Sequence, residues 1–284
     1  MIICRPERSE GPAFAEDKHV LRCAQDDKRL SVRALVALAA ILFSFRAQAQ
    51  GTPPVSFPPT AVAADSLPSF ERPNGALMRP GTLTYALSLI KPSGETTALG
   101  IRTVTVSDAT LGGNPGWLIA DARTGTVVPT SDSVFVARAD LMPERWIATI
   151  GRSQLGASFT RDSVFGAVQS YQGRASFSLP VPANVLLSAG MVERVIELLP
   201  LRDGYRAGVS LLLVDGLEPR VVPAEIIVER SEQVTAGNGA VDAWRVALRW
   251  GAMEQRLWIA RDGTRVVRTE QALTDGVLIS LLQP

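Results

Sequence analysis

The residues best suited to nucleophilic or metal chemistry gather near the N-terminus of this 284-residue chain. Cys4, Cys23 and His19, which are both cysteines and the single histidine, all precede an apolar leader. Because Ser-His-Asp and Cys-His catalysis need a histidine beside the nucleophile, removal of the leader would close both routes. Lys91 could form a Ser-Lys dyad only within 91–94, where Pro, Ser and Gly are typical of a β-turn.

Carboxylates are the remaining groups that could carry out acid–base chemistry or bind a cation. Glu193 and Glu197 lie one helical turn apart and could share a cation, but like charges at this spacing are more typical of two exposed positions. A carboxylate pair within about 10 Å would favour a hydrolase mechanism, although no spacing in the sequence indicates one. The acidic residues considered for such a pair are Asp132, Asp140, Asp162, Glu193, Glu197, Asp203 and Glu225.

Cofactor motifs and a nucleic-acid footprint are both missing from the sequence. No calcium loop, P-loop or dinucleotide motif is present, and the Gly-rich run at 112–116 lacks the helix that a phosphate site needs. The first 49 residues hold 8 Lys/Arg and 6 Asp/Glu of the chain's 29 and 28, so the remainder carries 21 and 22. This near-neutral balance argues against nucleic-acid binding. We therefore predict no metal site, no cofactor and no enzymatic activity.

The segment 30–49 has the features of a signal peptide. Basic residues at 28–33 precede an apolar run that is too short for a transmembrane helix, and Ala-Gln-Ala at 47–49 forms a small-residue cleavage site. We predict cleavage after Ala49 and a periplasmic or secreted protein that is not an integral membrane protein; the alternative is an uncleaved anchor. Residues 1–29 resemble peptide translated from an interspersed repeat element and are interpreted as a mis-annotated start.

A Pro-rich tether over 50–80 leads to a single β-domain over 81–284. Short apolar runs separated by turn residues are typical of an antiparallel meander. Asn238-Gly239 and Asp262-Gly263 are typical of hairpin turns. The predicted strands are 82–90, 99–107, 116–122, 127–136, 144–150, 155–161, 164–177 with a break at 172–173, 206–214, 221–230, 240–250, 254–260, 265–271 and 277–282.

One segment departs from the strand pattern. Leu187, Met191, Val195 and Leu198 recur at helical spacing behind two prolines, and Asn184 could cap the helix. The sequence therefore predicts one main helix, over 184–199, inserted between two sets of strands.

Three runs carry a resemblance to a known group of proteins: 198–205 (LLPLRDGY), 236–246 (AGNGAVDAWRV) and 257–268 (LWIARDGTRVVR). They resemble an uncharacterised family of exported bacterial β-proteins, a domain of unknown function, whose members are similar in fold to LolA-type outer-membrane lipoprotein carriers. The resemblance covers roughly 81 to the C-terminus. It implies a strongly curved antiparallel sheet, a half-barrel, with the helix across its concave side over an apolar cavity, and it implies no catalytic residues.

Two apolar stripes could line such a cavity. One face of the strand at 240–250 carries two tryptophans, because large apolar residues there alternate with arginine and alanine. The helix adds a methionine, which suits an adaptable lining. The same stripes could equally pack against each other in a dry core. The candidate ligand-lining residues are Leu187, Met191, Val195, Trp244, Val246, Leu248 and Trp250.

These observations favour a non-enzymatic periplasmic or secreted module. It would hold an apolar ligand, such as a lipid or a lipoprotein acyl chain, between the helix and the sheet. The alternative is a structural or protein-interaction module of the cell envelope, with a packed interior, apolar patches outside it and an envelope protein as its partner.

Overall fold

The described part of the chain is mainly β-sheet. The computed structural model describes residues 68, 70–126, 128–187, 189–215, 218–237, 239–261 and 265–284. The predicted start at 1–29, the signal peptide at 30–49 and most of the tether at 50–80 lie outside these residues. The strands are β1 Gly81–Ile90, β2 Thr96–Leu111, β3 Asn114–Thr124, β4 Thr130–Ala137, β5 Pro143–Ile150, β6 Ser153–Phe159, β7 Ser163–Ser170, β8 Gly173–Pro180, β9 Val185–Leu186, β10 Arg206–Asp215, β11 Glu218–Ala236, β12 Gly239–Trp250, β13 Met253–Ala260, β14 Val266–Leu273 and β15 Gly276–Leu282.

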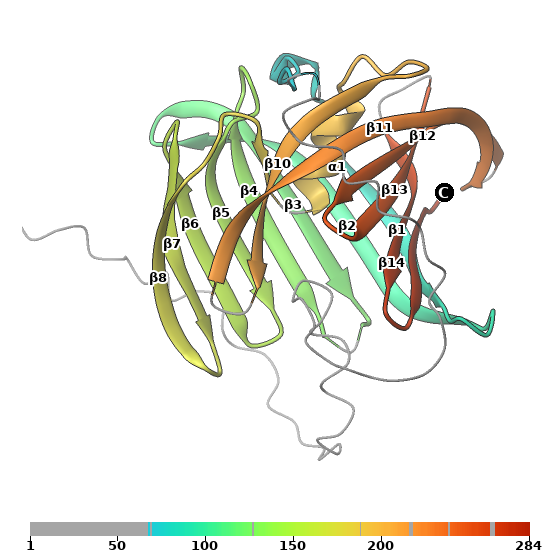
Figure 1. The fold of residues 1–284 in the computed structure, drawn as a ribbon, viewed down its shortest axis with the longest axis horizontal. Helices are drawn as coiled ribbons and strands as arrows, with labels where there is room; N and C mark the ends of the chain where they lie inside the picture. Colours follow the sequence, from blue (N-terminus) through green and yellow to red (C-terminus); the bar gives the residue numbers. More distant parts are fainter. Residues whose placement is uncertain are drawn as a thin grey trace, which may run out of the picture. The chain divides into compact units, whose positions relative to one another are not determined.

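These strands form one sheet in the order β8-β7-β6-β5-β4-β3-β2-β1-β15-β14-β13-β12-β11-β10-β9. Each neighbouring pair is antiparallel except β9 and β10, which are parallel. The sheet is strongly curved (Figure 1), and β8 approaches β11 from the far end of the strand order. The predicted fold class, a curved antiparallel sheet with one main helix inserted mid-chain against the concave side, is confirmed.

The first and last strands meet in the middle of the sheet. Tyr85 of β1 lies opposite Leu282 of β15, and the main-chain N–H of Gln283 donates to the Thr84 carbonyl at 2.8 Å. The sheet therefore consists of two meanders, β1–β8 and β10–β15, which are joined along this seam. Chain segments from opposite ends of the domain supply its central pair of strands.

The helix α1, Ala189–Glu197, is shorter than predicted, and it is buried at each residue from Gly190 to Glu197. The predicted start at Asn184 was wrong, because Val185 and Leu186 form β9 and pair with β10. The Asn184 side chain donates to the Gly208 carbonyl at 3.2 Å, so it holds β10 instead of capping the helix. Pairing with a distant strand thus overrides the local helical spacing.

The end of the predicted tether packs onto the sheet. Phe70 and Met78 are buried, and the short 3-10 helix η3, Gly75–Leu77, lies between them in the sequence. The indole N–H of Trp117 donates to the Gly75 carbonyl at 2.9 Å. The Arg72 guanidinium donates to the Leu141 carbonyl at 2.9 Å. Over 70–80 the chain is therefore fixed by apolar burial and by hydrogen bonds.

Candidate functional site

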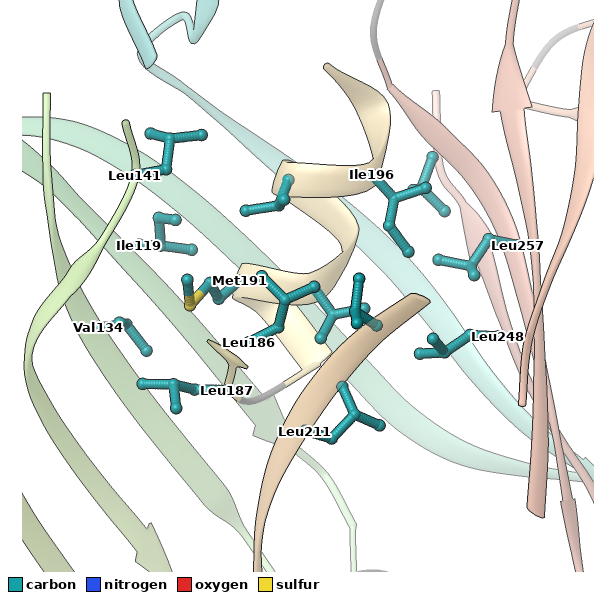
Figure 2. Close-up of a cluster of buried hydrophobic side chains, with 14 of the residues drawn as sticks. Ile119, Val134, Leu141, Leu186, Leu187, Met191, Ile196, Leu211, Leu248 and Leu257 are labelled. Carbon is teal, nitrogen blue, oxygen red and sulfur yellow. The ribbon is translucent and has the colours of Figure 1, made fainter. Parts of the chain in front are cut away.

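The inner face of the sheet and α1 form one continuous apolar cluster. Of the candidate lining residues, five are at most 1% exposed, whereas Trp244 and Trp250 are partly buried at its margin. Figure 2 shows Met191 on the side of Ile119 and Val134, whereas Ile196 points toward Leu257. The helix therefore packs its apolar side chains against both meanders. The five buried residues are Leu187, Met191, Val195, Val246 and Leu248.

A buried guanidinium joins the helix to the first meander. Arg102 of β2 donates through Nε and Nη2 to Asp121 of β3 at 3.0 and 2.7 Å. Its Nη1 donates to Glu193 Oε1 of α1 at 2.7 Å. Arg102 is 1% exposed and Glu193 is fully buried, so these hydrogen bonds replace the water that both charges lose.

The last turn of α1 makes a second polar contact, with β1 and β14. Arg194 pairs with Glu197 at 2.7 Å and donates to the Tyr85 hydroxyl at 3.4 Å. The Glu197 carboxylate accepts from the main-chain N–H of Val266. The Tyr85 hydroxyl donates to the Val266 carbonyl at 3.0 Å. We call the six side chains of these two contacts the inner cluster: Tyr85, Arg102, Asp121, Glu193, Arg194 and Glu197.

Burial and charge act in opposite directions on the acids of the inner cluster. Burial raises the pKa of Glu197 to about 8, and Arg194 and the Val266 N–H only partly offset it. Burial also disfavours ionised Asp121, but the Arg102 guanidinium outweighs it and lowers the pKa of Asp121. The two ends of the cluster therefore differ: Asp121 is firmly ionised, and Glu197 titrates near neutral pH.

Close packing brings α1 against β3. A Cβ atom at Gly190 would lie 3.0 Å from Asp121 Cβ, which is tighter than ordinary contact. A larger side chain at this position would push the first turn of the helix away from the sheet. Gly190 thus allows Glu193, one turn later, to reach Arg102.

The structure corrects the interpretation of Glu193 and Glu197 as exposed positions. Both are buried, and the cations beside them are Arg102 and Arg194. The curved sheet surrounds α1, so no side of the helix is left for solvent. Sequence reasoning also missed Arg102 and Asp121, although each shares the strand parity of buried apolar neighbours: Val104 for Arg102 and Ile119 for Asp121.

The other acidic candidates are dispersed. Asp140 accepts from the Met142 N–H at 3.1 Å, and Asp162 accepts from the Thr160 hydroxyl at 3.1 Å, so both serve turns. Glu225 pairs with Arg206 at 2.9 Å. Within the inner cluster, Asp121 and Glu193 converge on one guanidinium, that of Arg102. The Arg102 guanidinium holds the pKa of Asp121 below its usual range, so this carboxyl stays ionised.

The outer face of the second meander carries a different set of charges. Glu229 of β11 accepts from Arg245 at 2.6 Å and from Arg249 at 3.2 Å, both on β12. Glu254 of β13 accepts from Arg249 at 2.7 Å and from Arg256 at 2.6 Å. We call these five side chains the outer ladder. A shallow pocket of about 50 Å³ beside it is lined by Glu254, Arg256, Glu270, Ala272 and Val277.

Metal ligands and membrane-spanning helices were also sought. Within the described ranges, no three His, Cys, Asp or Glu side chains lie close enough together to hold a metal ion. The described part of the chain contains no helix with the length and apolar character needed to span a bilayer.

Comparison with known proteins gives one structural likeness. The chain is similar to a β-barrel-like protein of the domain of unknown function DUF1849 from Brucella abortus, with 12% sequence identity and a TM-score of 0.48. The similarity covers 75% of this chain and 97% of that one. No protein-family model matches the chain, and no curated protein matches it significantly. The likeness to LolA-type carriers stays a prediction.

Proposed function

We propose that this protein is a non-enzymatic periplasmic or secreted module that binds an apolar ligand, such as a lipid or acyl chain, on the inner face of its sheet. In the closed form, α1 occupies that face. A ligand binds when the helix moves outward and exposes the apolar side chains around Met191 and Leu248. The proposed periplasmic or secreted location depends on the predicted signal peptide, with cleavage after Ala49.

The observation that carries the proposal is the buried set of ion pairs within the otherwise apolar contact between α1 and the sheet. Buried ion pairs pay a desolvation cost that apolar packing of the same size avoids, so such contacts add little net stability. Glu193 Oε2 is also buried without a hydrogen-bond partner among the described residues, which costs further free energy. The helix is therefore held less firmly than its complete burial suggests.

A larger side chain at Gly190 tests the proposal. Gly190→Leu should push α1 off Asp121 and increase the uptake of N-phenyl-1-naphthylamine, a neutral apolar probe whose fluorescence rises on burial. Gly239→Leu is the matched control, because a Cβ atom at Gly239, at the start of β12, meets no described atom within 4 Å. Circular dichroism checks that both variants keep the sheet. If neither the native protein nor a folded Gly190→Leu variant takes up the probe, the proposal is wrong.

A second candidate function, a protein-interaction module of the envelope, is favoured by the outer face of the first meander. Ile147 and Phe165 are each 48% exposed there. Gly156 of β6 lies opposite Ile147, and Ser158 lies opposite Phe165, so small side chains separate these two large apolar ones. A photo-crosslinking residue at position 165 should then give one discrete adduct in intact cells, and the same residue at position 249 in the outer ladder should give none.

A further inference from the structure

We infer that the ligand of the inner face is an amphiphile with an anionic head group, a carboxylate or a phosphate, that takes the place of the Glu193 carboxylate on Arg102. This inference rests on the proposed function and names the chemical class of its ligand. The inference follows from the hydrogen-bonding groups on the sheet that would lose their partners when α1 moves outward.

At two polar contacts the sheet offers a hydrogen-bond donor and α1 offers the acceptor. Arg102 Nη1 donates to Glu193, and the Val266 main-chain N–H donates to Glu197. Arg102 keeps its bonds to Asp121 when the helix leaves, because those two residues lie on adjacent strands of the same sheet. The donors left open are thus Arg102 Nη1 and the Val266 N–H, and the acceptor left open is the Tyr85 hydroxyl oxygen, whose bond from Arg194 is the longest of the three at 3.4 Å.

A ligand that replaces the helix must satisfy these donors. An unsatisfied buried donor costs free energy, and the cost is larger for a charged group. An oxyanion accepts from both a guanidinium and a main-chain N–H, whereas an ammonium group can accept from neither. Arg123 lies opposite Arg102 in the β2–β3 register and adds a second cation on the same face. The two glutamates of α1 therefore act as internal substitutes for the ligand's head group.

Ligands that share one chain and differ in the head group provide the test. Binding of dodecanoate, dodecanol and dodecyltrimethylammonium to the purified protein is measured below their micellar concentrations by displacement of N-phenyl-1-naphthylamine. Dodecanoate should bind at least about tenfold more tightly than dodecanol, which corresponds to one charge-assisted hydrogen bond, and the ammonium compound should bind most weakly. Equal binding of dodecanoate and dodecanol would overturn this inference and leave the proposed function standing. Binding of none of the three would overturn the proposed function itself.

A variant without the charges around Arg102 tests whether these charges cause the preference for dodecanoate over dodecanol. The triple substitution R102Q/D121N/E193Q replaces the three hydrogen-bonded charges around Arg102 by amides, so none of these three ions is left without the others. It should bind dodecanol as the native protein does and lose the preference for dodecanoate. Arg249→Gln, on the outer ladder, should keep that preference. A folded triple variant that still prefers dodecanoate would contradict the assignment to Arg102.

One measurement on the native protein needs no variant. The carboxyl carbon of ¹³C-labelled dodecanoate reports its ionisation by NMR. A head group on Arg102 should stay ionised to lower pH than free dodecanoate, because the guanidinium favours the charged form. A bound carboxyl group that titrates as it does in water would place the head group in solvent and overturn the inference.

Discussion

The inner cluster and the outer ladder both contain arginine–glutamate pairs, but the surroundings of these pairs differ. In the inner cluster Arg102 is 1% exposed, and its partners lie on one neighbouring strand and on the helix. In the outer ladder the Arg249 side chain is 43% exposed, and its partners lie on neighbouring strands. Water and salt screen the ladder, whereas each charge of the cluster depends on its protein partner.

Ion pairs with similar N···O distances can therefore have different roles when their burial differs. Arg102–Glu193 and Arg249–Glu254 both measure 2.7 Å. The first pair decides where α1 lies, because loss of either side chain leaves a buried ion. The second keeps a sheet face soluble and contributes little free energy. Three predictions compare the two sets, ordered by the size of the expected effect.

Arg102→Gln should have the largest effect. It leaves the Asp121 and Glu193 carboxylates buried without the guanidinium that donates to both, so the free energy of unfolding should fall by about 3–5 kcal/mol. Urea denaturation followed by circular dichroism measures the change. If Arg102→Gln costs no more than Arg249→Gln, burial does not distinguish the two sets.

Glu197 should make stability depend on pH. Its pKa rises from the model-compound value of 4.5 to about 8 in the folded protein, so between these values the folded state holds the proton more tightly than the unfolded state does. Stability should therefore fall as the pH rises through this window, by roughly 2 kcal/mol between pH 6 and 8.

Urea denaturation of the native protein and of Glu197→Gln at pH 6 and pH 8 measures this dependence. The substitution should remove most of the fall, whereas Glu254→Gln in the outer ladder should leave it in place. A native protein whose stability is the same at both pH values would show that Glu197 is ionised throughout.

Arg249→Gln should have the smallest effect. It removes two partly exposed ion pairs, and the free energy of unfolding should fall by less than about 1 kcal/mol. Sodium chloride at high concentration should abolish even this difference, because it screens exposed charges. A larger, salt-independent loss would mean that the outer ladder acts as a buried network.

Local patterns in the sequence predicted the strands and the position of the helix. Alternation along Leu83, Tyr85 and Leu87 reflects a strand with one buried face, and β1 has this pattern. The break at 172–173 falls at the turn between β7 and β8. These features depend on neighbours in the chain, so a single sequence carries them.

The inner cluster could not be predicted in the same way, because its partners are distant in the sequence. Arg102 and Glu193 are 91 residues apart, and Glu197 and Val266 are 69 apart. The predicted start of α1 was wrong for a related reason. Val185 and Leu186 are extended because they pair with β10, which is distant in the sequence. The sequence did contain one signal for the inner cluster, the alternation along each strand. Arg102 and Asp121 occupy inward-facing positions of their strands, where a charge requires a partner.

The seam between β1 and β15 determines when this domain can be assembled. Hairpins such as β7–β8 join residues that are close in the chain, so they can form early. The seam joins Tyr85 to Leu282, and closing so long a loop is entropically costly and slow. A chain that lacks the last seven-residue strand would hold two meanders with no contact along their central edges. Completion of the sheet therefore requires β15, and a variant that lacks Gly276–Leu282 should leave the two meanders without strand pairing along this seam.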